Sequence, residues 1–225
     1  AKAAAKATKP ETELPPVTRE SAALMDRLAP YRFLIEKVSP EINGGRFPIK
    51  REVGDEVAVS ADIVCEGHGK VAASIMFRAE DQGTWHEVPM RHVDNDRWAG
   101  SFMVERNTRY RYTVAAWADA FTSLRSDMEK KLHADQAIDV DMVEMRTLLE
   151  LAHDKSSGPD RKALTELLEQ FDEAHMDSRS RLELLMGRPA ETLRRRCAMR
   201  PGLTHYEPEL EVYVDRVGAR FASWY

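Results

Sequence analysis

The stretch LEVYVDRVGARFASWY, residues 210–225, decides how the whole chain is arranged. Leu210, Val212 and Val214 recur at every second position, which is the period of a strand with one buried face. This stretch follows a long segment of helical periodicity, where a lone strand would leave its backbone N–H and C=O groups unpaired. We therefore expect residues 209–225 to pair with strands from much earlier in the sequence.

The region from residue 31 to residue 121 alternates with a period of two over several short runs. The clearest run is EVAVSADIVC at 56–65, where the apolar residues Val57, Val59, Ala61 and Ile63 would share one face. Turn signals separate the runs about every dozen residues, a spacing typical of an antiparallel sandwich. The region therefore predicts an immunoglobulin-like antiparallel β-sandwich that residues 209–225 complete.

Three local signals refine this prediction. Asn43-Gly44 is a strong signal for a tight turn. Pro48 limits the run at 46–53 to an edge or irregular strand, because proline has no N–H to donate to a ladder. Asp94-Asn95-Asp96 predicts a hairpin whose arms are 85–88 and 97–104.

Residues 122–208 have helical rather than strand periodicity. Apolar residues at i, i+3, i+4 and i+7 predict five helices, with their stripes at 124–132, 138–152, 164–171, 182–186 and 190–199. Leu168 lies on the third stripe, so Leu168→Ala is expected to cost ~2–5 kcal/mol. The expected fold class is thus α+β, with a flexible leader at 1–30, a β-sandwich at 31–121 plus 209–225, and an inserted α-helical bundle at 122–208.

Composition excludes several classes of protein. The 225 residues carry a formal net charge of -5, without the basic excess of a nucleic-acid-coating protein. No apolar run approaches the ~20 residues that span a bilayer, and the first residues lack the apolar core of a signal peptide. Two distant cysteines, Cys65 and Cys197, favour free thiols in a reducing cytoplasm. The absence of a first Met suggests processing or a segment of a longer protein.

Motifs for chemistry are scarce. G-x-S-x-G, P-loop, G-x-G-x-x-G and C-x-x-C sequences are absent. His133 with Asp135, and Glu173 with His175, stand at i, i+2, a spacing that does not put both groups on one helix face, so solvated charges outweigh a metal site. Asp94 and Asp96 form a possible carboxylate pair for glycoside chemistry, but turn formation is favoured there.

Two further groups are possible binding sites. Arg194-Arg195-Arg196 is a possible phosphate grip, although a solvated cationic face near a helix C-terminus is favoured. The four tryptophans are possible sugar-stacking platforms, although core or cross-strand packing is favoured for Trp85 and Trp98; they are Trp85, Trp98, Trp117 and Trp224. We predict no catalytic, cofactor-binding or metal-binding residue in this sequence.

Four segments together resemble one family. They are PEINGGRFPIKREVGDEV (40–57), WHEVPMRHVDNDRWAGSFMV (85–104), RYRYTVAAWADAFTSLRSDMEKKL (109–132) and GARFASWY (218–225), in the same order as in that family. They are similar to the amino-terminal region of the bacterial α-1,4-glucan:maltose-1-phosphate maltosyltransferases, members of the α-amylase superfamily. The resemblance implies an immunoglobulin-like sandwich interrupted by a helical bundle.

The resemblance also implies a function. In that family a (β/α)8 catalytic barrel follows the GARFASWY-like segment, and its two carboxylates transfer maltosyl units from maltose 1-phosphate to α-1,4-glucans without a metal or nucleotide. Residues 1–225 are then expected to be a non-catalytic part that supports the barrel and homodimer contacts in the cytoplasm of a bacterium. A carbohydrate-binding module is the main alternative, and a free-standing protein interaction module is a distant third.

Several apolar side chains are candidates for contacts at the surface of this segment. Met142, Met145 and Met186 are either an adaptable partner surface or fillers of gaps in the helical core. Phe221, Trp224 and Tyr225 would form an apolar patch at the end of the chain. The predicted partners are the barrel, a second copy of the chain and, through the parent enzyme, an α-glucan, with neither nucleic acid nor a membrane.

Overall fold

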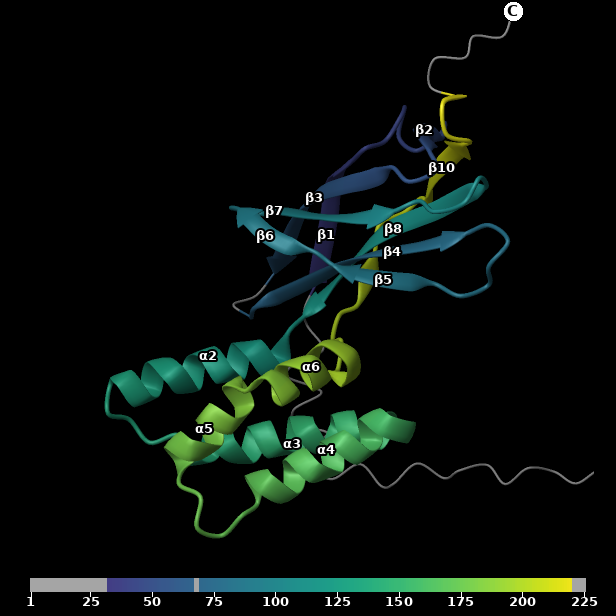
Figure 1. Ribbon diagram of the computed structural model, residues 1–225. Helices are drawn as coiled ribbons and strands as arrows, with labels where there is room; N and C mark the ends of the chain where they lie inside the picture. The colour runs from purple at the N-terminus through teal and green to yellow at the C-terminus, as the bar shows by residue number, and fades with distance from the viewer. Residues whose placement is uncertain (1–31, 67–68, 220–225) are drawn as a thin grey trace, which may run out of the picture.

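A computed structural model describes residues 32–66 and 69–219. Within this part of the chain, two β-sheets lie at one end and five helices lie at the other (Figure 1). The expected α+β class is therefore confirmed. The leader at 1–30 and the aromatic residues Phe221, Trp224 and Tyr225 lie outside the described residues.

The strands form a four-stranded sheet and a six-stranded sheet. The first has the order β1-β3-β7-β6 and consists of β1 (Arg32–Ser39), β3 (Glu56–Glu66), β7 (Arg97–Met103) and β6 (Arg91–Asp94). The second has the order β2-β10-β8-β4-β5, with β9 also paired to β8; it consists of β2 (Ile49–Glu52), β10 (Leu210–Asp215), β8 (Arg109–Ala118), β4 (Val71–Ala79), β5 (His86–Pro89) and β9 (Thr204–His205).

The late strand β10 rejoins the earlier strands, as its periodicity predicts. It pairs antiparallel with β8, with Val212 opposite Tyr110, and parallel with β2, with Val212 opposite Ile49. Leu210, Val212 and Val214 are all buried. The segment at 46–53 contributes the short edge strand β2, which begins immediately after Pro48, and Asn43 stands in the predicted turn with φ of 53°.

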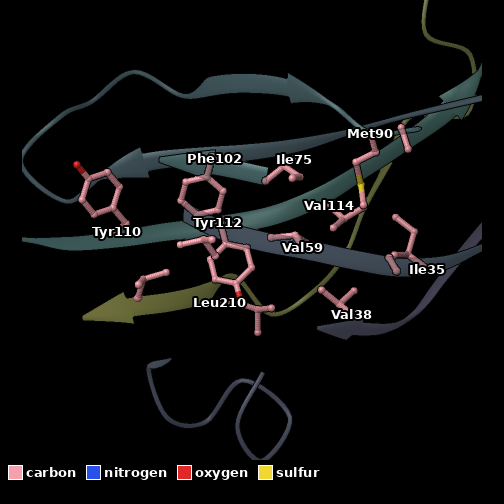
Figure 2. Close-up of a cluster of buried hydrophobic side chains, with 14 of the residues drawn as sticks. Ile35, Val38, Val59, Ile75, Met90, Phe102, Tyr110, Tyr112, Val114 and Leu210 are labelled. Carbon is pink, nitrogen blue, oxygen red and sulfur yellow. The ribbon is translucent and has the colours of Figure 1, made fainter. Parts of the chain in front are cut away.

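A single hydrophobic core lies between the two sheets. Figure 2 shows Val59 and Phe102 of the four-stranded sheet beside Ile75 and Val114 of the six-stranded sheet. The Phe77 and Phe102 rings stack across the sheets with their centroids 4.4 Å apart. The alternate residues of β3 are buried because each strand turns one face toward this core.

The hairpin around Asn95 is confirmed as a turn, but one of its predicted arms is wrong. The partner of β7 is β6 at 91–94, whereas β5 at 86–89 pairs with β4 in the other sheet. The chain passes from one sheet to the other at Met90, which is buried in the shared core and donates its N–H to the carbonyl of Ala73 at 2.8 Å. A period of two identifies a strand but does not reveal its partner.

The five helices follow the predicted stripes. They are α2 (Ala120–His133), α3 (Asp139–Lys155), α4 (Gly158–Phe171), α5 (Ser178–Met186) and α6 (Arg188–Cys197). Their apolar faces form a second core that includes Met142 and Met145, so these two methionines are core fillers, while Met186 is exposed. Leu167 is buried, but Leu168 is only partly buried against this core, so the structure lowers the cost that we expect for Leu168→Ala.

The helical segment leaves and re-enters the sheet region at neighbouring points. Helix α2 begins two residues after β8 ends, and the returning chain meets the end of β8 where the Ala118 N–H donates to the Pro201 carbonyl at 2.9 Å. Strand β9 then pairs with Ala115 and Ala116 of β8. The last seven residues of β8 are all buried.

Candidate functional site

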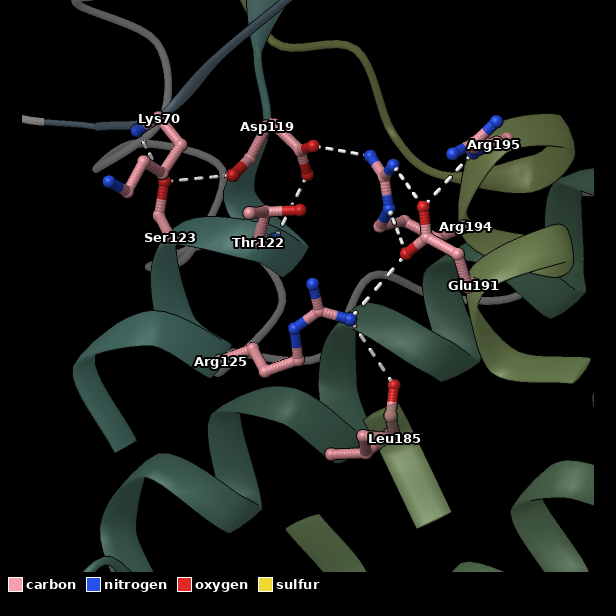
Figure 3. Close-up of polar contacts among 9 residues, drawn as sticks. All are labelled: Lys70, Asp119, Thr122, Ser123, Arg125, Leu185, Glu191, Arg194 and Arg195. Carbon is pink, nitrogen blue, oxygen red and sulfur yellow. Dashed lines mark hydrogen bonds and ion pairs between the residues drawn. The ribbon is translucent and has the colours of Figure 1, made fainter. Parts of the chain in front are cut away.

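A cleft of about 1040 Å³ lies at the junction of the sheets and the helices. Residues of β4, β5 and β7 line one wall, and residues of α2 and α6 line the other. The cleft is lined by six arginines and three carboxylates: Arg91, Arg125, Arg194, Arg195, Arg196, Arg200, Glu87, Asp119 and Asp160. Figure 3 shows the polar contacts on its helical side.

Asp119 joins the sheet to two helices. It is buried at the start of α2, where its Oδ1 accepts a hydrogen bond from the Thr122 N–H at 3.0 Å, the bond of a helix N-cap. Its own N–H donates to the Lys70 carbonyl at 2.8 Å, which ties it to the beginning of β4. Its Oδ2 accepts from Nη1 of Arg194, a residue of α6 (Figure 3).

Arg194 and Glu191 continue this network along α6. Arg194 donates from Nε and Nη2 to the two carboxylate oxygens of Glu191 at 3.0 and 2.7 Å. Arg195 donates to the same carboxylate at 3.0 Å, and Arg125 of α2 lies 3.5 Å from it. The hydrogen bond from Arg194, supported by the charges of Arg194 and Arg125, lowers the pKa of Glu191 to about 2.

Arg200 forms a second contact between the returning chain and the sheet. Its Nη2 donates to both carboxylate oxygens of Glu87 at 3.0 and 2.9 Å. Its guanidinium carbon lies 4.2 Å from the centroid of the Trp117 ring, a cation–π contact. Glu87 also accepts a hydrogen bond from the Ser74 hydroxyl at 2.7 Å, so its carboxylate is fixed in place.

The sequence predicts that the three arginines of the Arg194-Arg195-Arg196 run are solvated, but Arg194 is not. The Arg194 side chain is only 17% exposed, because it reaches back to Asp119 and Glu191. Arg195 and Arg196 are well exposed, as predicted, and Arg196 pairs with Asp160 at 2.9 Å. Sequence spacing indicates the Glu191–Arg194 contact at i, i+3, but it gives no sign of Asp119, which lies 75 residues away.

The tryptophans have different surroundings. Trp98 lies opposite His92 on β6, with ring centroids 5.4 Å apart, so the expected cross-strand packing is confirmed. Trp117 is buried beneath Arg200. Trp85 is half-buried under the guanidinium of Arg78 at 4.7 Å, and Trp224 lies outside the described residues.

The remaining candidate residues are dispersed. Asp94 and Asp96 flank the exposed turn at Asn95, as predicted. His133 and Asp135 are exposed, and His175 is 86% exposed beside Glu173. Within residues 32–66 and 69–219, no group of three His, Cys, Asp or Glu residues is arranged to hold a metal ion. Cys65 and Cys197 are free thiols.

None of the helices in the described part of the chain has the length and apolar character needed to cross a membrane.

Comparison with known proteins gives one consistent result. The family model for α-1,4-glucan:maltose-1-phosphate maltosyltransferase, domain N/S, matches residues 31–216, a span that contains every strand and helix described above. The maltosyltransferase of that name from Cereibacter sphaeroides is 37% identical over 199 residues, which are 88% of this chain and 33% of that protein. The maltosyltransferase of the same name from Chlorobaculum tepidum is 34% identical over 217 residues, which are 96% of this chain and 32% of that protein.

A third relative agrees with these two. The enzyme of the same name from Myxococcus xanthus is 36% identical over 208 residues, which are 85% of this chain and 30% of that protein. The chain spans about a third of the length of the curated relatives it matches. It belongs to the α-1,4-glucan:maltose-1-phosphate maltosyltransferase family and corresponds to the N/S region of that family.

Proposed function

We propose that this chain is the non-catalytic N/S part of a maltosyltransferase that moves maltosyl units from maltose 1-phosphate to α-1,4-glucans in a bacterial cytoplasm. The observation that supports a non-catalytic role is the state of the carboxylates in the large cleft. Glu87, Asp119 and Asp160 are each held in an ion pair with an arginine. Retaining glycosyl transfer needs one carboxylate free to attack and a second to exchange a proton.

The proposed architecture is an immunoglobulin-like sandwich, residues 31–121 plus 209–225, with a helical bundle at 122–208 inserted into it. Two features support this division. The two sheets share one core, and the helices have another. The chain that leaves β8 for the helices at Ala118 is hydrogen-bonded to the chain that returns from them at Pro201, so the helices can be inserted with little disturbance to the sheet.

The catalytic part of this proposal is tested by phosphate release. The purified 225-residue chain is mixed with maltose 1-phosphate and a maltooligosaccharide, and a full-length relative is assayed in parallel as the positive control. We expect no phosphate from the chain above the buffer rate. Sustained turnover by the chain would contradict the non-catalytic assignment.

The proposed role in assembly rests on exposed apolar side chains on α3. Val140 is 81% exposed and Val143 is 57% exposed. The two side chains lie one helical turn apart, so they share one exposed face of α3, whose other apolar residues are mostly buried. We expect the chain to form a dimer in multi-angle light scattering, and Val140→Glu with Val143→Glu to shift it to a monomer. Val93→Glu, at an exposed site on β6, is the matched control. A wild-type monomer at high concentration would count against the role in dimerisation.

A carbohydrate-binding role is a second candidate, favoured by a smaller cleft on the outer face of the six-stranded sheet. This cleft has a volume of about 310 Å³ and is lined by Trp85, His205, Glu207 and Glu209, a combination of indole and polar groups suited to a sugar ring. Titration with maltoheptaose, followed by tryptophan fluorescence, tests it. A saturable response that Trp85→Ala abolishes would support this role, and no response would remove it.

A further inference from the structure

The arginines of the large cleft leave many hydrogen-bond donors unused. An arginine has five N–H donors in a planar fork. Arg125 donates only from Nη1 and Arg200 only from Nη2 to described residues. Arg195 uses Nε alone, and the side chain of Arg91 makes no hydrogen bond or ion pair within the described residues. Arg194, in contrast, has all three nitrogens engaged.

Charge is also unbalanced in this cleft. Six arginines line it, against the three carboxylates of Glu87, Asp119 and Asp160, and Glu191 adds a fourth carboxylate behind them. The chain as a whole has a net charge of -5. A protein with an acidic balance thus concentrates positive charge where a concave surface raises the local potential for anions.

A further polar atom lies in the wall of the same cleft. The Thr122 Oγ1 is buried and has no hydrogen-bond partner, although it stands between Asp119 and Arg125 (Figure 3). Native proteins pair almost all such atoms, so a water or a ligand oxygen is the expected partner at this position. Trp98 and Pro89 add apolar surface to the cleft, whereas Trp117 is buried beneath Arg200.

We propose that this cleft binds a phosphate monoester carried on a sugar. Guanidinium forks match the oxygens of a phosphate, and the four arginines with unused donors, Arg91, Arg125, Arg195 and Arg200, all line this cleft. The indole and proline surfaces suit the apolar face of a sugar ring. The volume of about 1040 Å³ is ample for a disaccharide phosphate.

The test is isothermal titration of the 225-residue chain at low ionic strength with three probes: maltose 1-phosphate, inorganic phosphate and maltose. We expect saturable binding of maltose 1-phosphate, weaker binding of inorganic phosphate and none of maltose. Raising the salt concentration should weaken the binding, because the attraction is largely between charges. Inorganic phosphate binding as tightly as maltose 1-phosphate would overturn the sugar part of the proposal.

Two variants locate the site without disturbing the core. Arg91→Gln and Arg195→Gln each remove an exposed guanidinium that lines the cleft, and each should weaken binding about tenfold. Arg32→Gln on β1, at the far edge of the four-stranded sheet, removes another exposed positive charge and should leave binding unchanged. Absence of binding to maltose 1-phosphate, or equal weakening by Arg32→Gln, would overturn the proposal. Neither result would bear on phosphate release, which tests the non-catalytic assignment separately.

Discussion

The sheet region and the helical region are stabilised over very different distances along the chain. The sheet core combines Phe33 near one end of the described chain with Val214 near the other. The helical core is made by one continuous segment, from Phe121 to Leu193. The sheets therefore depend on contacts between residues that are far apart in the sequence, whereas the helices depend on contacts between residues within about seventy positions of one another. The Asp119 network is where these two regions are joined.

The distribution of tryptophans allows the two regions to be followed separately. Trp85, Trp98 and Trp117 all lie in the strands or beside them, and the helical segment has no tryptophan. Fluorescence from these three tryptophans therefore reports the sheets, while circular dichroism at 222 nm reports mainly the helices; Trp224 lies outside the described residues. A substitution that unfolds one region before the other should separate the unfolding transitions followed by these two signals, and a substitution that affects both regions equally should leave the transitions coincident.

The largest effect is expected from Ile75→Ala. Ile75 is fully buried in β4, and its side chain faces Gly100 of the opposite sheet. Removing it leaves a cavity between the sheets and should cost about 4 kcal/mol of unfolding free energy. Urea unfolding followed by fluorescence measures this loss. A loss below about 1 kcal/mol would mean that the sheets do not share a close-packed core.

A pair of substitutions on α4 tests the helical core. Leu167→Ala should cost about 3 kcal/mol, because Leu167 is 4% exposed in that core. Leu168→Ala, one residue further along, should cost about 1 kcal/mol, because Leu168 is only partly buried. Urea unfolding followed by circular dichroism gives both values. Equal losses for the two variants would show that the buried face of α4 is misassigned.

Asp119→Ala tests the connection between the two regions. It removes both the cap of α2 and the ion pair to Arg194, and should cost about 2 kcal/mol. We expect the fluorescence and circular dichroism transitions to separate in this variant. Asp177→Ala is the matched control: Asp177 caps α5 in the same way, with the Ser180 N–H donating to it at 2.7 Å, but it does not contact the sheets. Coincident transitions in Asp119→Ala would show that the network is not the connection.

The smallest effect is a dependence on pH at Glu191. Its pKa falls from 4.5 to about 2 on folding, so its carboxylate stabilises the native state above pH 4.5 and loses that contribution as the pH falls toward 2. Glu191→Gln should lose about 1 kcal/mol at pH 7, since part of the side chain is exposed, and almost nothing at pH 2. Urea midpoints measured from pH 7 to pH 2 give this difference. A constant difference across that range would contradict the assigned pKa.

The sequence predicts most of the secondary structure because the periodicities are strong. The alternation in 56–65, the helical stripe containing Leu164 and Leu167, and the return of Val212 to the sheets are confirmed. The pairing of β5 is not predictable in this way, because the short strands on either side of Met90 have the same local pattern although they belong to different sheets.

The candidate site is less predictable than the fold. The run of three arginines is visible in the sequence, but the burial of Arg194 depends on Asp119, a residue of a different element. Asp119 by itself resembles any helix cap. The cleft becomes positively charged only when the end of β8, the first turn of α2 and the last turn of α6 come together. Contacts between such distant elements cannot be predicted from local sequence patterns.

The position of β2 has a consequence for synthesis of the protein. In the described structure its strand neighbour is β10, and β10 begins at Leu210, long after β2 ends at Glu52. A nascent chain on the ribosome must therefore hold β2 without this neighbour for about ten to thirty seconds at ordinary rates of translation. The helices, which are made in the interval, can fold before the sheet is closed.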